Sequence, residues 1–160
     1  GDGLKPKLPS GQVDWVVGSA MGAVTFAYAV AESLGARAAF TEKDGERMVL
    51  SRFEIAPGER ILVVEDVIST GGSTVKTIAG IESAGAGRAV ILPMVVCLVN
   101  RSGKRDLDGR EIRALLTPAI QSWKPEECPL CKQGSQAVRP KTHWRELTAC
   151  GAWSVESGER

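Results

Sequence analysis

Short runs of apolar residues alternate with small-residue turns and amphipathic stretches along most of the chain. The apolar runs predict buried strands at 13–17, 36–40, 61–64, 89–99 and 110–120. Apolar residues recur at helical spacing from Val24 to Leu34, just before Gly35, and a second helix is predicted from Thr74 to about Ala84. This alternation predicts an α/β fold: a mainly parallel twisted sheet with helices on both faces.

Several segments depart from this alternation. Residues 41–55 predict a hairpin with a turn at 42–47 and a returning strand at 48–55. Pro93 predicts a bulge or an edge position in its strand, because proline cannot donate to the ladder. Residues 1–12 are rich in Gly, Pro and Lys and are interpreted as a linker or a trimmed terminus. Residues 141–160 follow no pattern, which leaves 13–140 as the predicted domain and 141–160 as a tail of unknown structure.

Composition narrows the class of protein. The chain has 160 residues, of which 43% are hydrophobic and 24% charged, typical of one globular domain. A formal net charge of +1 argues against nucleic acid or an acidic membrane as a partner. The apolar runs are too short to span a bilayer, and residues 1–12 lack the apolar core of a signal peptide, so we expect a cytoplasmic protein.

The candidate chemistry is concentrated directly after the strand at 61–64. Glu65 and Asp66 stand at its carboxyl end, and Ser-Thr-Gly-Gly-Ser at 69–73 leads into the predicted helix. Such a turn presents backbone N–H groups and the helix dipole to a phosphate. The spacing is neither that of a Walker loop nor Gly-x-Gly-x-x-Gly. Carboxylates beside a phosphate repel it electrostatically, so we expect the acidic pair to hold ribose hydroxyls or a metal. For an isolated Glu-Asp pair, capping of the next helix is the alternative.

A second small-residue turn, Gly18–Ala23, joins the strand at 13–17 to the helix at 24–34. The carboxyl ends of parallel strands meet at one edge of a sheet, so we expect both turns to face one ligand. A tight turn without a ligand is the alternative for this segment alone. Lys43, Arg47 and Arg52 of the hairpin are available to bring cations to the same edge.

The stretch Ile61–Ser73 closely resembles the phosphoribosyl pyrophosphate (PRPP) motif of type I phosphoribosyltransferases, and residues from about Val13 to about Pro140 resemble the short-loop orotate-using members. The resemblance implies transfer of a phosphoribosyl group from PRPP to orotate by a homodimer with Mg²⁺ as cofactor and no direct protein ligand to the metal. It implies PRPP binding by Ser19, Ala20, Met21, Gly22, Glu65, Asp66, Val67, Ile68, Ser69, Thr70, Gly71, Gly72 and Ser73. It also implies catalytic roles for Lys43, Arg52 and Asp66, and orotate contacts from Ser69 and Arg101.

The chain departs from this family pattern at several positions. Ser19 replaces a proline and Ala23 a glycine in the first turn, while Lys43 and Ser51 replace basic residues of the hairpin. The family's N-terminal segment, which covers the base, precedes the point where this chain begins. A purine phosphoribosyltransferase and a PRPP-sensing regulator without catalysis are the alternative functions.

Four cysteines are present: Cys97, Cys128, Cys131 and Cys150. Cys97 lies in an apolar strand pattern and is interpreted as a small buried residue. Cys128 and Cys131 form a single C-x-x-C motif late in the chain, for which a structural or incidental role is favoured. A metal site that also uses His143 and Cys150, or a redox role, is the alternative.

Overall fold

The computed structural model describes residues 13–84, 89–121, 123–135, 138 and 142–145. The chain forms two compact units, the first ending at Ile120 and the second beginning at Gln121. The first unit contains strands β1 (Trp15–Ser19), β2 (Arg37–Asp44), β3 (Arg47–Val49), β4 (Arg60–Ile68), β5 (Val90–Asn100), β6 (Asp106–Leu107) and β7 (Arg110–Leu116), with helices α1 (Val24–Leu34) and α2 (Gly72–Ser83). The second contains the short helix α3 (Pro129–Lys132).

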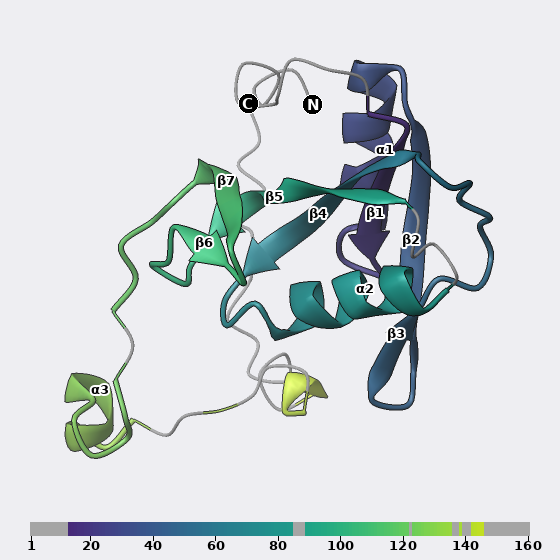
Figure 1. The fold of residues 1–160 in the computed structure, drawn as a ribbon. Helices are drawn as coiled ribbons and strands as arrows, with labels where there is room; N and C mark the ends of the chain where they lie inside the picture. Colours follow the sequence, from purple (N-terminus) through teal and green to yellow (C-terminus); the bar gives the residue numbers. More distant parts are fainter. Residues whose placement is uncertain (1–12, 85–88, 122, 136–137, 139–141, 146–160) are drawn as a thin grey trace, which may run out of the picture. The chain divides into compact units, whose positions relative to one another are not determined.

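The strands of the first unit form one sheet in the order β3-β2-β1-β4-β5-β7-β6 (Figure 1). The pairs β1·β2, β1·β4, β4·β5 and β5·β7 are parallel, whereas β3 and β6 add antiparallel partners at the two edges. The predicted mainly parallel sheet is therefore confirmed. Strand β4 is central, as its uninterrupted apolar run predicts.

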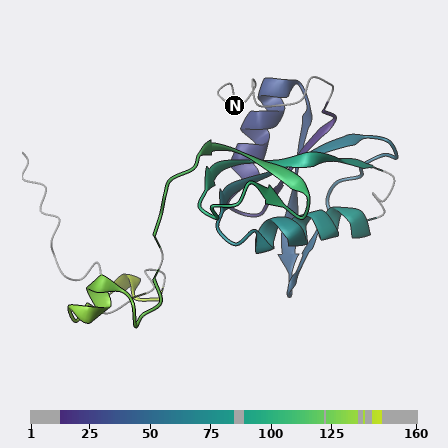
Figure 2. The same ribbon diagram turned by 60° about the vertical axis from the view of Figure 1, so that its left-hand side comes forward.

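The two helices cover opposite faces of this sheet, as Figures 1 and 2 show. Phe26 and Val30 of α1 pack in one core cluster with Leu62 of β4. Ile78 and Ile81 of α2 pack in the other cluster, with further residues of β4 and β5. Each fully buried aliphatic side chain contributes about 1.5–3 kcal/mol to folding. These two clusters fix the register that brings the carboxyl ends of β1 and β4 together.

The predicted helix at 24–34 has the observed bounds, and Gly35 ends it with φ 66° in the left-handed region. The bulge predicted at Pro93 is also present, because the β4·β5 register shifts between Ile61, opposite Ile91, and Val63, opposite Val95. The strand thus skips the residue that has no N–H to offer.

The hairpin differs from its prediction. Strand β2 continues through the expected turn to Asp44, and the returning strand β3 ends at Val49. The expected pairing over 48–55 fails because Phe53 packs against the core instead, with its ring 5.1 Å from that of Phe40 and 6.2 Å from that of Trp15.

The carboxyl-terminal strand is also shorter than predicted, since β7 ends at Leu116 instead of residue 120. The two-residue strand β6, which pairs with β7, is too short to leave a periodic signal in the sequence.

The predicted linker at 1–12 and most of the predicted tail at 141–160 lie outside the described residues. Within the described part of the chain, no helix has the length and apolar character needed to cross a membrane.

Candidate functional site

The turns after β1 and β4 meet at one edge of the sheet, as predicted. The two strands are parallel neighbours with Gly18 in register with Val64, so the first turn leaves the sheet beside Glu65 and Asp66, while β4 continues to Ile68. Gly22 of the first turn lies directly against the carboxylate of Asp66, and a Cβ on Gly22 would collide with it. The absence of a side chain at Gly22 therefore lets the first turn reach the acidic pair.

Glu65 is the buried carboxylate of this edge. Its side chain is 4% exposed, and the Ser19 hydroxyl lies 2.7 Å from Oε1 and 2.9 Å from Oε2. Burial raises the pKa of Glu65 to about 7, with a further increase from the neighbouring Asp66 carboxylate, while the Ser19 hydrogen bond acts in the opposite direction. Ser19, which stands where the family has proline, thus connects the first turn to the acidic pair.

Asp66 lies further toward the surface than Glu65. Its Oδ1 accepts a hydrogen bond of 2.7 Å from the backbone N–H of Val67. The side chain is half-buried beside Gly22, at the junction between the two turns. A carboxylate at this position can accept hydrogen bonds from vicinal hydroxyls of a bound sugar.

The second turn has the geometry of an anion site. Gly71 adopts φ 87°, in the left-handed region, and precedes the first residue of α2. The first N–H groups of a helix have no partner within the helix. A small cavity of about 30 Å³ is lined by Glu65 and by the residues from Val67 to Thr74. All five residues of the predicted phosphate turn, Ser69 to Ser73, therefore line one concavity.

A larger cavity of about 230 Å³ joins the first turn, the hairpin and the start of α2. It is lined by Ser19, Ala20, Lys43, Glu46, Arg47, Met48, Ser73 and Lys76. The structure thus brings the predicted Lys43 to the ligand edge, together with two further cations, Arg47 and Lys76. Lys76 was missed from the sequence, although its spacing of three residues from Ser73 places both on one helix face.

Arg52, the other predicted catalytic cation, is not brought to this cavity. Its Nε lies 2.5 Å from Oε2 of Glu42 and its Nη2 lies 3.1 Å from Oε1, so the guanidinium grips one carboxylate on the surface. This contact lowers the pKa of Glu42. Of the three hairpin cations, Lys43 and Arg47 line this cavity, and Arg52 does not.

Arg101 lies at the same sheet edge, after β5. Its backbone N–H donates a hydrogen bond of 2.8 Å to the carbonyl of Ile68, which leads into the phosphate turn. The buried Asn100 organises the loop that follows: its Oδ1 accepts from the Ser102 hydroxyl at 2.6 Å, and its Nδ2 donates to the Lys104 carbonyl at 2.8 Å. The exposed Arg101 side chain is therefore carried on an anchored loop next to Ser69.

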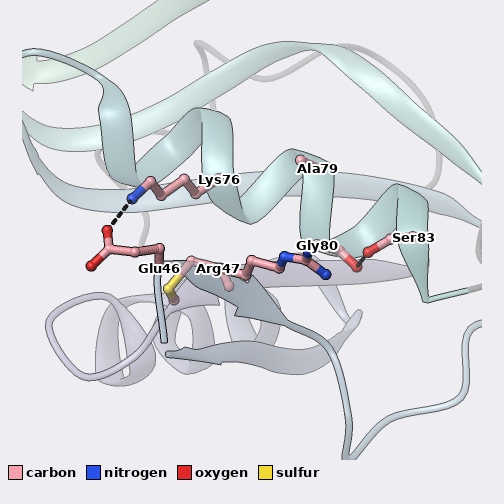
Figure 3. Close-up of a pocket in the computed structure, with 7 residues that line it drawn as sticks. Glu46, Arg47, Lys76, Ala79, Gly80 and Ser83 are labelled. Atoms are coloured by element: carbon pink, nitrogen blue, oxygen red, sulfur yellow. Dashed lines mark hydrogen bonds and ion pairs between the residues drawn. The ribbon is translucent and has the colours of Figure 1, made fainter. Parts of the chain in front are cut away.

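The hairpin packs directly against α2, with β3 next to Gly80. A cavity of about 340 Å³ lies between them. Figure 3 shows residues that line it, with Lys76 turned toward Glu46 of the hairpin; the Nζ–Oε2 distance is 3.4 Å. A Cβ on Gly80 would collide with the Met48 carbonyl, so Gly80 allows the close approach of strand and helix. The position of the hairpin cations therefore depends on this contact.

Comparisons with known proteins agree with this geometry. Residues 9–123 match the phosphoribosyl transferase domain family. An orotate phosphoribosyltransferase of Desulforamulus reducens is 48% identical over 138 residues, which cover 85% of this chain and 69% of that protein. One of Heliobacterium modesticaldum is 44% identical, with 81% and 66% covered. The chain thus spans about two thirds of the length of these relatives.

Solved structures show the same fold. A phosphoribosyltransferase from Corynebacterium diphtheriae superposes with a TM-score of 0.61 at 26% identity, covering 73% of this chain and 71% of that one. An adenine phosphoribosyltransferase from Thermoanaerobacter pseudethanolicus gives a TM-score of 0.60 at 20% identity, covering 72% and 76%. At this level of identity the second likeness concerns the fold alone.

Proposed function

Because the chain belongs to the phosphoribosyltransferase family, we propose that it transfers the phosphoribosyl group of PRPP to orotate, forming orotidine 5′-phosphate and pyrophosphate. Its relatives at 40–48% identity carry the name orotate phosphoribosyltransferase. The observation that carries the proposal is the contact between Gly22 and Asp66, which joins a pyrophosphate-type turn to the acidic pair ahead of a phosphate turn.

Different parts of PRPP bind to different segments at this edge of the sheet. The turn from Ser69 to Ser73 binds the 5′-phosphate with its N–H groups, and Glu65 and Asp66 bind the ribose hydroxyls. The first turn, Ser19 to Gly22, binds the pyrophosphate. This order follows the geometry, since Asp66 lies between the two turns and ribose lies between the two phosphate groups of PRPP.

Charge development explains the need for the cationic cavity. As pyrophosphate departs, the ribose becomes positive and the leaving group gains negative charge. Cations that meet charge formed only in the transition state raise the rate more than they raise ground-state affinity. Lys43, with Arg47 and Lys76 in the same cavity, is placed for this role.

We propose that Mg²⁺ accompanies PRPP at this edge, near Glu65 and Asp66 and without a direct protein ligand. Within the described residues no group of three or more His, Cys, Asp or Glu side chains is placed to hold a metal ion. The adjacent carboxylates fit an ion that keeps most of its waters, which is the usual behaviour of Mg²⁺. Bound there, Mg²⁺ would neutralise charge on the departing pyrophosphate.

Orotate is proposed to contact Ser69 and Arg101. Arg101 offers a planar guanidinium with several donors, which matches a carboxylate such as that of orotate. We further propose that the protein works in the cytoplasm as a homodimer on these small molecules, without nucleic acid or membrane partners. Its formal net charge of +1 supports the last point.

A panel of bases tests the proposal. The protein is incubated with PRPP and Mg²⁺, then with orotate, uracil, adenine, guanine or hypoxanthine, and pyrophosphate release is followed. Orotate-dependent release is expected, with Asp66→Asn as a control that folds but binds PRPP weakly. Release with a purine and none with orotate would overturn the choice of base, and PRPP binding without release for any base would support a regulator instead.

A further inference from the structure

Two cysteines of the second unit are not among the residues assigned to the proposed transfer reaction. Cys128 immediately precedes α3 and Cys131 lies within it. The Lys132 N–H donates a bond of 3.1 Å to the Cys128 carbonyl, which closes a helical turn around the pair. Both residues are half-buried, and neither is in a disulfide in this structure.

This turn places the two thiols on one side of the chain. Each thiol influences the pKa of the other, in opposite directions. Side chains three residues apart on a helical turn have Cβ atoms about 5–6 Å apart. A disulfide needs Cβ atoms about 3.5–4.5 Å apart, so closing the bond requires a local adjustment of this turn, which begins at the extended backbone of Cys128.

The two thiols differ in their chemistry. Contacts with the backbone of Cys131, followed by its thiol, lower the pKa of Cys128, whereas the Cys128 contact raises the pKa of Cys131. Cys97 offers a contrast within the same chain, because burial, then the charge of Glu65, raises its pKa to about 12. Cys128 is therefore the better nucleophile of the three at neutral pH, since the thiolate is the reactive form.

We propose that Cys128 and Cys131 form a reversible redox site that exchanges with small-molecule disulfides such as oxidised glutathione. The Cys128 thiolate attacks one sulfur of the small disulfide, whose S–S bond breaks and releases one thiol. The Cys131 thiolate then attacks the Cys128 sulfur of the mixed disulfide and releases the second thiol. The two cysteines lose two electrons and two protons, and the small disulfide is reduced to two thiols. The site is independent of the proposed transfer reaction.

The test uses the full chain carrying Cys150→Ser, so that Cys97, Cys128 and Cys131 are the remaining thiols. After incubation with oxidised glutathione, the product is trapped with an alkylating agent, digested and analysed by mass spectrometry. A peptide with Cys128 joined to Cys131 is expected, with Cys97 left reduced, and dithiothreitol should reverse it. Cys131→Ser should instead accumulate one glutathione on Cys128, while Cys128→Ser should react at least ~10-fold more slowly.

Three outcomes would overturn the proposal. One is a stable glutathione adduct on Cys128 in the Cys150→Ser chain, because the Cys131 thiol would then be out of reach. Another is equal rates for the two serine variants. The third is an equimolar zinc ion, measured in the purified protein, whose removal alone allows oxidation, since the pair would then serve as metal ligands.

Discussion

Replacing Glu65 with glutamine tests two things: how much the buried carboxylate lowers the stability of the fold, and whether it binds the ribose of PRPP. The folded-state pKa of Glu65 is about 7, above its ordinary value of 4.5, chiefly because burial disfavours the charged form. One pKa unit corresponds to about 1.4 kcal/mol of stability. Ionising Glu65 in the folded protein therefore costs about 2–3 kcal/mol, allowing for its coupling to Asp66.

The direction with pH follows from the raised pKa. A group of this kind favours folding below its unfolded pKa of 4.5, and that contribution is lost as the pH rises through about 7. Glutamine keeps the hydrogen bond with the Ser19 hydroxyl but never ionises. Glu65→Gln should therefore match the wild type near pH 4.5 and exceed its free energy of unfolding by about 2–3 kcal/mol at pH 8. Groups that do not interact with Glu65 titrate alike in both proteins and cancel in the difference.

Urea unfolding from pH 4.5 to 8.5, without ligand, measures this difference. The exposed Glu54→Gln is the matched control and should change stability by less than about 0.5 kcal/mol throughout. A constant difference in unfolding free energy between Glu65→Gln and wild type at every pH would refute the raised pKa.

Calorimetry should show weaker PRPP binding by Glu65→Gln, because an amide is a poorer acceptor for ribose hydroxyls. A gain in stability with unchanged PRPP affinity would remove Glu65 from the site.

Asp66→Asn should weaken PRPP binding in calorimetry with an unchanged circular dichroism spectrum, and equal affinity would contradict its role at the ribose. Lys43→Ala should lower kcat with little change in PRPP affinity, because its charge meets the leaving group; an unaltered kcat would place catalysis elsewhere. Gly80→Ala should displace the hairpin from α2 and lower kcat, with the exposed Ala79→Gly as control, and full activity would show that this contact is unimportant. Arg101→Lys should reduce the preference for orotate over uracil by about 10- to 100-fold, since a bidentate charged pair contributes roughly 1.5–3 kcal/mol; a retained preference would assign orotate to another residue.

Local rules allowed much of the scaffold to be predicted from sequence. The bounds of α1 follow from its apolar spacing and from Gly35, whose positive φ only glycine adopts without cost. The central position of β4 follows from an apolar run buried on both faces. Because these signals are read within a few neighbouring residues, the two turns could be assigned to one edge before any contact between them was known.

Contacts between distant segments decided the rest. Ser19 and Glu65 are 46 residues apart in the chain, yet their hydrogen bond and the burial around it set the pKa of the central carboxylate. Phe53 leaves the predicted strand because rings from β1 and β2 offer it a core position. Arg52 is taken up by Glu42 on the surface. Each outcome depends on which residues the folded chain brings into contact. Such long-range contacts produce no periodic pattern in the sequence, so they could not be predicted from it.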